Sequence, residues 1–249
     1  MSVCALRECD PNLPGFWFDH ILDNDACSAL RAVLAANGRH SPSGRHLVNE
    51  ADEVRGLHVI LEGWAVLYKS LPEGQRQIID IAVPGNFFNL SSADGHTAVI
   101  GLETVTTALI AAVPFKQWAR LEATLPQVAR VVQKEAGATR SRISERMLRL
   151  GRGSAEERLA YAFLELGVRT GAMRDDTIRS CQIPVTQSHL GDFMGLTSVH
   201  VCRTLRRMKR DGVMASSNHI DLCKFDVAAL EYLAGISVSE LAREIMPLG

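Results

Sequence analysis

One segment near the C-terminal end constrains the fold more than any other part of this 249-residue chain. Residues 187–206 read QSHLGDFMGLTSVHVCRTLR, and their apolar and small residues fall where two helices joined by a tight turn require them. We expect Leu190, Met194, Leu196 and Val201 to form the core that the two helices share. The pattern therefore predicts a pair of short packed helices.

Two glycines and two threonines support this interpretation. Gly191 allows the helices to approach closely, and Gly195 stands where the turn needs a residue that tolerates a positive φ. Thr186 and Thr197 stand at the two N-cap positions, where a hydroxyl can accept from free backbone amides. These agreements predict a helix-turn-helix; the alternative is a generic helix pair with an incidental glycine turn.

The second helix has a polar face that suits the major groove of DNA. Its exposed side is expected to lie opposite the core residues Val201 and Leu205. On that side Arg203 can form two hydrogen bonds to a guanine, with Ser198 and Val199 in support. The remaining polar residues are expected to contact phosphates. The predicted DNA-binding residues are Thr186, Gln187, Thr197, Ser198, Val199, His200, Cys202, Arg203, Arg206, Arg207, Lys209 and Arg210.

The charge distribution agrees with a polyanionic partner. The chain carries a net charge of -1, but residues 127–210 hold 16 basic against 8 acidic side chains. Residues 1–126 hold 9 against 14, and residues 211–249 hold 2 against 6. A basic segment in an acidic chain indicates one module that meets a polyanion, although a solvated charged face would look the same. After this segment, residues 213–215, a turn at 216–218 and residues 219–222 are predicted to form a hairpin, the wing of a winged helix.

The N-terminal half reads as a helix followed by closely spaced strands. An amphipathic helix is expected over residues 23–37. The strands are expected at 57–62, 64–68, 76–83, 97–100 and 104–113, with a turn at 71–74. Their spacing favours an antiparallel barrel or sandwich over alternating strands and helices.

A long helix is predicted over residues 126–150, followed by a break at 151–153 and a capping box from Ser154 to Glu157 that opens the next helix. About twenty-five residues is long for a globular helix, so we expect it to pair with its copy in a second subunit. The alternative is that it packs only on its own domain. The predicted dimerisation residues are Val128, Val132, Thr139, Ile143, Met147 and Leu150.

Composition limits the class of protein. Hydrophobic residues make up 47% and charged residues 22%, which is ordinary for a soluble globular chain. No apolar run approaches the roughly 20 residues of a membrane span, and the N-terminus does not read as a signal peptide, so we expect a cytoplasmic protein without membrane contact. The six scattered cysteines are most simply free thiols in a reducing compartment.

The chain resembles the Crp/Fnr family of bacterial transcription regulators over nearly its whole length. The resemblance lies in residues 61–63 (LEG), 74–77 (GQRQ) and 84–87 (PGNF), together with the long helix and the winged helix-turn-helix. It implies an α+β fold: an antiparallel, jelly-roll-like β-roll over 1–125, a dimerisation helix over 126–152, and a winged helix-turn-helix over 153–249. It further implies a homodimer on a palindromic DNA site, with RNA polymerase as a further partner.

Departures from the family pattern bear on the signal. Members that bind cyclic AMP carry a Gly-Glu pair and an Arg-Ser or Arg-Thr step after the Pro-Gly turn, whereas residues 87–103 contain neither the pair nor any arginine. A buried phosphate would lack its guanidinium partner, so we expect a degenerate effector domain that does not respond to cyclic AMP. The candidate effector pocket consists of Phe87, Asn89, Leu90, His96 and Thr97, although His96 reads equally as a structural residue.

The cysteines leave a redox-responsive alternative open. Cys4, Cys9 and Cys27 precede the β-roll, but their spacing does not match known iron-sulfur runs, and we expect no metal or other cofactor. Cys202 lies near Arg203, whose charge could activate a thiol; the alternative is a small side chain tolerated near DNA. Val199 stands where many members have a glutamate, which predicts an apolar contact with a thymine methyl and an altered operator.

Two other classes of function compete with DNA binding. A metal-dependent β-barrel enzyme would need a tight histidine cluster, which His40, His46 and His58 do not supply, and no feature requires enzyme activity. A ligand-binding module could signal without DNA, but the basic run argues against it. The hypothesis is therefore a homodimeric, sequence-specific transcription regulator whose small-molecule effector is unknown, with a cyclic-nucleotide-, thiol- or metal-responsive regulator as the alternative.

Overall fold

The computed structural model describes residues 16–93, 95–173, 179–216 and 223–247, which form two compact units. Of these residues, unit 1 contains 16–65, 82–93, 95–136 and 247, and unit 2 contains 66–81, 137–173, 179–216 and 223–246. The division into three domains at residues 125 and 152 stays a prediction. None of the described helices is both long and apolar enough to cross a membrane.

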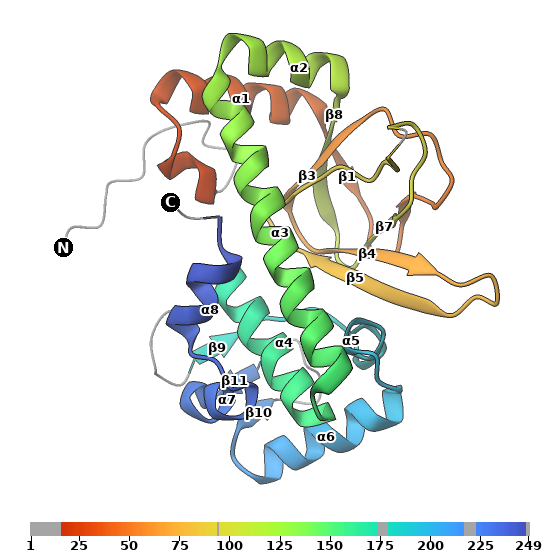
Figure 1. The fold of residues 1–249 in the computed structure, drawn as a ribbon, viewed down its shortest axis with the longest axis vertical. Coiled ribbons are helices and arrows are strands. Elements are labelled where there is room, and N and C mark those ends of the chain that lie inside the picture. Colours follow the sequence, from red (N-terminus) through yellow and green to blue (C-terminus); the bar gives the residue numbers. More distant parts are fainter. Residues whose placement is uncertain (1–15, 94, 174–178, 217–222, 248–249) are drawn as a thin grey trace. The chain divides into compact units, whose positions relative to one another are not determined.

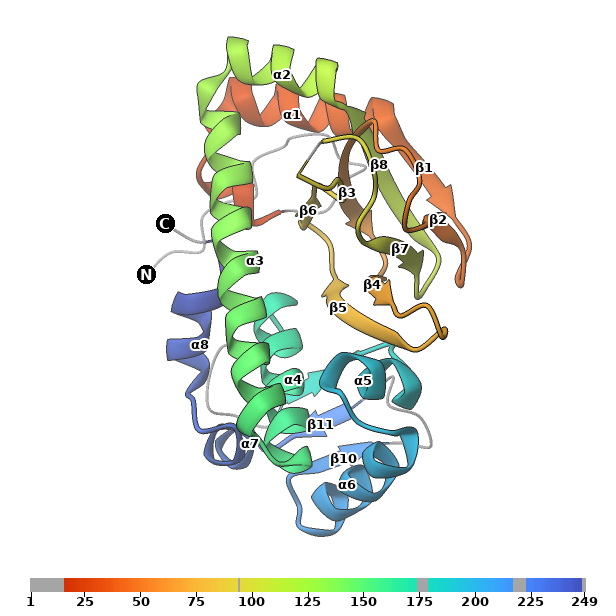
Figure 2. The same ribbon diagram turned by 45° about the vertical axis from the view of Figure 1, so that its right-hand side comes forward.

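Unit 1 consists of antiparallel strands covered by helices (Figures 1 and 2). One sheet has the strand order β1-β8-β3-β6, and β2 pairs with β7. The elements are the 3₁₀-helix η1 (Trp17–His20), α1 (Asn24–Asn37), β1 (Gly38–Ser41), β2 (His46–Val48), β3 (Gly56–Glu62), β6 (Phe87–Phe88), β7 (Gly101–Thr104), β8 (Ala108–Pro114) and α2 (Phe115–Thr124). The antiparallel β fold expected from strand spacing is confirmed.

The core of unit 1 lies between the sheet and its helices. Alternate residues of β3, namely Leu57, Val59 and Leu61, belong to one buried cluster, as the two-residue period of a strand requires. Phe18 from η1 and Trp118 from α2 join this cluster. The helix expected over 23–37 is confirmed as α1, whose N-cap Asp23 accepts from the Ala26 amide.

Two of the strand predictions need correction, and three short strands were missed. Residues 97–100 form only isolated bridges, Glu53 with Thr97 and Ser91 with Ala98. The run at 104–113 is two strands, since β7 ends at Thr104 and β8 begins at Ala108 after a bend. Val105, Thr106 and Thr107 are β-branched residues that favour strands, so residue type did not reveal the bend. The short strands β1, β2 and β6 were not predicted.

Unit 2 is mainly helical and contains a three-stranded sheet of order β10-β11-β9 (Figures 1 and 2). Its buried centre is α4, which is covered from Leu159 to Arg169. The strands β4 and β5 are neighbours in a sheet, and residues 66–81, which include most of both strands, belong to this unit. The elements are β4 (Ala65–Ser70), β5 (Arg76–Ala82), α4 (Ala155–Arg169), β9 (Arg179–Cys181), α5 (Gln187–Met194), α6 (Ser198–Arg210), β10 (Met214–Ser216), β11 (Cys223–Phe225), α7 (Val227–Ala234) and α8 (Val238–Ile245).

The predicted long helix is confirmed as α3 (Pro126–Arg152), whose first part lies in unit 1 and whose second part lies in unit 2. The capping box is confirmed as well: the Ser154 amide donates to Glu157 Oε2 at 2.6 Å, and the Glu157 amide donates to Ser154 Oγ at 3.3 Å. These bonds satisfy amides at the start of α4 that have no partner inside the helix. They also hold the pKa of Glu157 below its usual value.

Candidate nucleic-acid interface

Helices α5 and α6 form the predicted helix-turn-helix (Figure 1). Gly195 ends α5 in the left-handed region with φ of 62°, which accounts for a glycine in the turn. Gly191 lies so close to the turn that a Cβ there would meet the carbonyl oxygen of Leu196 at 2.6 Å. Both predicted roles of the glycines are therefore confirmed.

Both predicted N-caps are present. Thr186 Oγ1 accepts from the His189 amide at 3.0 Å, and Thr197 Oγ1 accepts from the His200 amide at 3.2 Å. The backbone amide of Thr186 donates in turn to His189 Nδ1 at 3.3 Å, so the histidine occupies the place that glutamate or glutamine takes in most capping boxes. The caps fix where each helix begins.

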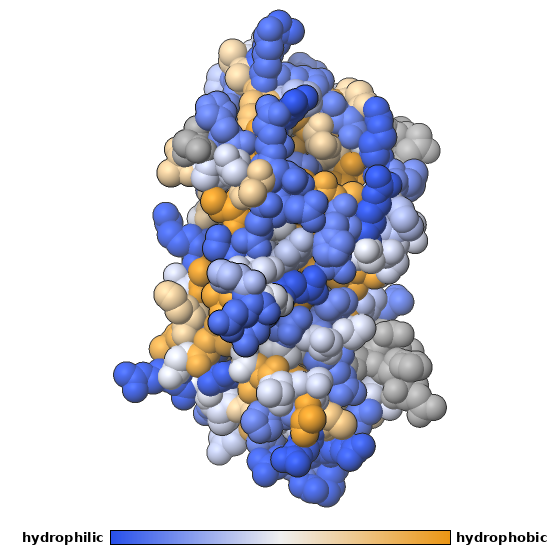
Figure 3. Space-filling model, turned by 90° about the vertical axis from the view of Figure 1, so that its right-hand side faces the viewer, coloured by the Kyte–Doolittle hydropathy of each residue, from blue (hydrophilic) through white to orange (hydrophobic). Residues whose placement is uncertain are grey.

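Helix α6 has one buried face and one polar face. Val201, Leu205 and Met208 are buried, and Val199 is 56% exposed at the opposite side. Cys202 is half-buried. Hydrophilic side chains cover the lowest part of the face shown in Figure 3, at the height where α6 lies in Figure 1. The other exposed residues of α6 are Ser198, His200, Arg203, Arg206, Arg207, Lys209 and Arg210.

The basic residues of α6 differ in their neighbours. Arg207 Nη1 lies 3.4 Å from a carboxylate oxygen of Glu156 on α4, and Arg210 Nε lies 3.3 Å from one of Asp211. Exposed pairs of this kind contribute little energy, so both arginines can exchange a carboxylate for a phosphate. Within the described ranges no carboxylate pairs with Arg203. The guanidinium of Arg203 is thus available at the polar face.

A hairpin follows α6, as predicted for a wing. Strand β10 pairs antiparallel with β11, with Met214 opposite Phe225 and Ser216 opposite Cys223. The described second strand is β11 (Cys223–Phe225), and the predicted 219–222 lie outside the described residues together with 217 and 218. Strand β9 adds to the other edge of β11.

The predicted dimerisation residues lie in different surroundings along α3. Val128 is fully buried in the unit 1 core and Val132 packs against it, while Thr139 Oγ1 accepts from Arg142 at 2.7 Å. Ile143 and Met147 are 39% and 64% exposed. Leu150 contacts the turn of the helix-turn-helix, since its Cδ2 lies 3.0 Å from the Cβ position of Gly195.

A row of residues on α3, most of them small or apolar, is exposed to solvent. Its members recur at intervals of three and four, so they lie on one face of the helix. They are Gln133, Ala136, Arg140, Ile143, Ser144, Met147, Leu148 and Gly151. We call this row the α3 stripe. All eight are exposed when the described part of the chain is considered.

The residues of the candidate effector pocket do not share one environment. Phe87 and Leu90 are buried, and Phe87 packs edge-on against Phe18 and Trp118 in the unit 1 core. Asn89 and His96 are exposed. Thr97 lies in the isolated bridge with Glu53 and is half-buried. The assignment of these five residues to a pocket stays a prediction.

The cysteines and histidines form no metal cluster among the residues that the structure describes. Cys27 is buried on α1, where its thiol donates to Asp19 Oδ1 at 3.2 Å. Cys4 and Cys9 lie outside the described residues. His58 on β3 is mostly buried, and burial lowers the pKa of its imidazole to about 4.

Unit 2 contains a buried ion cluster that was not predicted from the sequence. Asp80 on β5 accepts from Arg169 at 2.8 Å and from Arg146 at 3.0 Å, and its second oxygen lies 3.6 Å from Arg142 Nε. Glu165 pairs with Arg169 at 2.9 Å and with Arg146 at 3.5 Å. Burial opposes ionisation of Asp80, but the three arginines together hold the pKa of its carboxyl below its usual range.

Two signals in the sequence could have revealed this cluster. Asp80 is the one acidic residue in an otherwise apolar strand of sequence IIDIAV, and a buried carboxylate needs a cationic partner. Arg142 and Arg146 are four residues apart on α3, so they lie on the same face of the helix. Neither signal indicates that Asp80 contacts the two arginines of α3, because these residues are more than sixty positions apart in the sequence.

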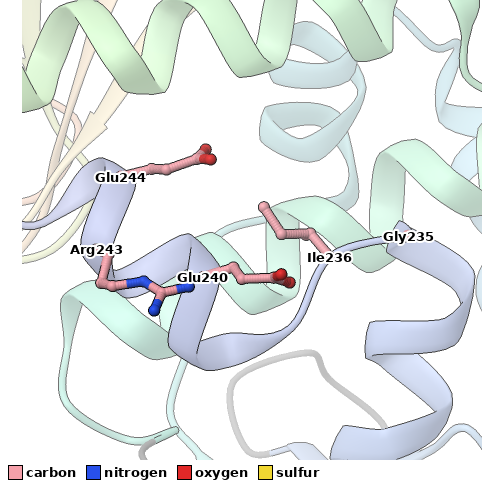
Figure 4. A pocket seen from close by; sticks show the side chains of 5 residues that line it. All are labelled: Gly235, Ile236, Glu240, Arg243 and Glu244. Atoms are coloured by element: carbon pink, nitrogen blue, oxygen red, sulfur yellow. The ribbon is translucent and has the colours of Figure 1, made fainter.

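An open hollow of about 430 Å³ lies beside α8 (Figure 4). It is lined by Gly235, Ile236, Glu240, Arg243 and Glu244. The carboxylate of Glu240 already accepts from the amide and the hydroxyl of Ser237 as a helix cap, and these bonds lower its pKa.

Comparison with known proteins agrees with this geometry. Residues 157–233 match the Crp-like helix-turn-helix domain, and residues 38–124 match the cyclic nucleotide-binding domain. The nitrogen fixation regulation protein FixK of Bradyrhizobium diazoefficiens is 32% identical over 217 residues, which is 84% of this chain and 89% of that protein. The transcriptional activatory protein AadR of Rhodopseudomonas palustris is 32% identical over 180 residues, which is 72% of this chain and 73% of that protein.

The fold has a close counterpart among solved structures. FixK2 from Bradyrhizobium japonicum superposes with a TM-score of 0.69 at 22% identity, covering 80% of this chain and 96% of that one. The helix-turn-helix with its exposed basic helix, the antiparallel sheets of unit 1 and the two domain matches lead to one conclusion. The chain belongs to the Crp/Fnr family and is a DNA-binding transcription regulator.

Proposed function

We propose that the protein acts as a homodimer on a palindromic site, with one α6 in each of two successive major grooves. The α3 stripe supports this: Ile143, Met147 and Leu148 are 39%, 64% and 53% exposed on one long helix. Apolar residues at such intervals suit a parallel helix of a second copy. Two-fold symmetry of the protein then requires a two-fold symmetric operator with half-sites about one helical turn apart.

Arg203 is the residue that we assign to base reading. It lies on the exposed face of α6, one turn after the N-terminal residues Ser198 and Val199. A guanidinium there can donate two hydrogen bonds to guanine O6 and N7, while Val199 contacts a thymine methyl. Thr197, His200, Arg206, Arg207, Lys209 and Arg210 then position the phosphate backbone, with Thr186 and Gln187 at the start of α5. The exposed, uncompensated Arg203 carries this assignment.

The test compares two charge removals on the same helix. Arg203→Ala should weaken binding to a selected operator by about 1 to 3 kcal/mol and relax discrimination at one base pair. Lys209→Ala is the matched control: it should weaken specific and random duplexes equally and reduce the salt dependence. Equal losses on operator and random DNA for Arg203→Ala would remove Arg203 from base reading.

The second part of the proposal concerns the small-molecule effector. Because residues 87–103 contain no arginine, we propose that DNA binding needs no cyclic AMP. A change in the DNA affinity on addition of cyclic AMP would overturn this. The proposed function involves contacts with DNA, a second copy and RNA polymerase, and it requires no catalytic step.

A further inference from the structure

Strand β5 lies in the region that matches the cyclic nucleotide-binding domain, but most of it packs in unit 2. The match to the cyclic nucleotide-binding domain covers residues 38–124, which include all of β4 and β5. Residues 66–81 nevertheless pack in the compact unit that contains the helix-turn-helix. Within unit 2, the side chains of β5 that make these contacts therefore join a strand of the region matched to the cyclic nucleotide-binding domain to the DNA-binding elements.

Gln77 on β5 contacts the end of α5, the first helix of the helix-turn-helix. Its Nε2 donates to the carbonyl oxygen of Asp192 at 2.5 Å and to that of Phe193 at 3.3 Å. The last carbonyls of a helix have no partner within the helix, so Gln77 satisfies two of them at once. Beside it, Arg76 Nε lies 3.8 Å from a carboxylate oxygen of Asp192.

Asp80 connects the same strand, β5, to helices α3 and α4. Its carboxylate joins Arg142 and Arg146 of α3 to Arg169 of α4, and all four side chains are at most 4% exposed. The guanidinium of Arg146 also lies 4.6 Å from the ring centre of Phe193 on α5. The ion cluster and the Gln77 contacts thus converge on the C-terminal turn of α5.

We propose that Gln77 and Asp80 are positioning residues for DNA binding, through which β5 holds the helix-turn-helix in one orientation. This inference rests on the proposed binding of a dimer to two half-sites. Two recognition helices at a fixed separation bind best when each is already oriented, because a mobile helix loses conformational freedom on binding. Loosening β5 should therefore weaken binding and reduce the preference for one half-site spacing.

The test is Gln77→Glu in the full-length protein. The change replaces the donor by a carboxylate oxygen, which faces two carbonyl oxygens and lies near the negative end of α5. Gln75→Glu is the matched control, because it makes the same change at an exposed side chain of the same hairpin. Asp80→Asn is the second variant. If Asp80→Asn does not fold, the result for Gln77→Glu alone decides whether β5 positions the helix-turn-helix.

The readout is the affinity for two duplexes, one with the selected half-site spacing and one with a single base pair inserted between the half-sites. Gln77→Glu should weaken binding to the selected duplex about ten-fold, from the loss of two hydrogen bonds, and should lower the ratio of the two affinities. Gln75→Glu should behave as the wild type. Hydrogen exchange of the α5 amides should accelerate only in Gln77→Glu.

Each other outcome contradicts the proposal. A fall in both affinities by one factor, with the ratio unchanged, would mean that the variant only reduces the folded fraction. Binding equal to that of Gln75→Glu, or tighter binding, would also overturn it. If the wild type itself shows no preference for one spacing, the proposed dimeric function fails, and this inference fails with it.

Discussion

Replacing Gly191 by alanine tests the packing of the helix-turn-helix directly. A Cβ at this position would lie 2.6 Å from the Leu196 carbonyl oxygen, whereas such a carbon normally stays about 3.3 Å away. The Leu196 amide also donates to the Gly191 carbonyl at 2.9 Å, so the turn is held against α5 and cannot move freely. The clash should therefore displace the turn and, with it, the start of α6.

The expected magnitude combines two opposing contributions. Overpacking a fitted site costs about 1 to 3 kcal/mol, and alanine in place of glycine inside a helix returns up to about 1 kcal/mol. We therefore expect Gly191→Ala to lower the free energy of unfolding by about 1 to 2 kcal/mol, measured by urea denaturation, and to weaken specific DNA binding. Gly137→Ala is the control, because no atom lies within 4 Å of its Cβ position on α3 and Gly137 is not a member of the α3 stripe.

The control should be as stable as the wild type or slightly more stable. The reasoning is refuted if Gly191→Ala is no less stable than Gly137→Ala. It is refuted as well if Gly191→Ala loses stability but binds the operator with unchanged affinity, since the turn would then not position α6.

Three further predictions follow from the geometry. Met147→Glu should shift the protein from dimer to monomer in sedimentation equilibrium, while Tyr232→Glu, at a residue 87% exposed on α7, should not; equal behaviour would remove the α3 stripe from the interface. Burial lowers the pKa of His58 to about 4 in the folded protein, so the unfolded chain binds the proton more readily below pH 6.5, and stability present above pH 6.5 is lost as the pH falls toward 4. At pH 4.5 this loss should be about 2.5 kcal/mol, so His58→Leu should lose about that much less free energy of unfolding than the wild type between pH 7 and pH 4.5, measured by urea denaturation of both proteins. Thr197→Ala should cost about 1 kcal/mol by removing the α6 cap, and an unchanged denaturation midpoint would contradict the role of the 3.2 Å bond to the His200 amide.

The elements with strong local signals were predictable from the sequence. Gly195, Thr186 and Thr197 mark the ends of α5 and α6 because turn and cap chemistry acts over a few residues. The long helix and the capping box at Ser154 were predictable for the same reason. The identity of the polar face of α6 then followed from helical periodicity.

Contacts between distant residues were not predictable. Residues 105–107 bend between two strands although all three are β-branched residues that favour strands, so the strand boundary was missed. Val128 fits the heptad of the dimer prediction, yet it packs in the core of unit 1, because a helix period does not say which neighbour covers a face. The pairing of Asp80 with Arg146 is a tertiary contact that no local pattern encodes.

The measurement that tests the central claim most directly is the selection of bound sequences from a random duplex library by the purified protein. The account predicts a palindromic motif with half-sites about one helical turn apart, recovered without cyclic AMP and both with and without reductant. A motif recovered only with cyclic AMP would contradict the proposed effector independence, and dependence on reductant would assign a role to Cys202. The absence of any motif in all four conditions would contradict sequence-specific DNA binding by the protein alone.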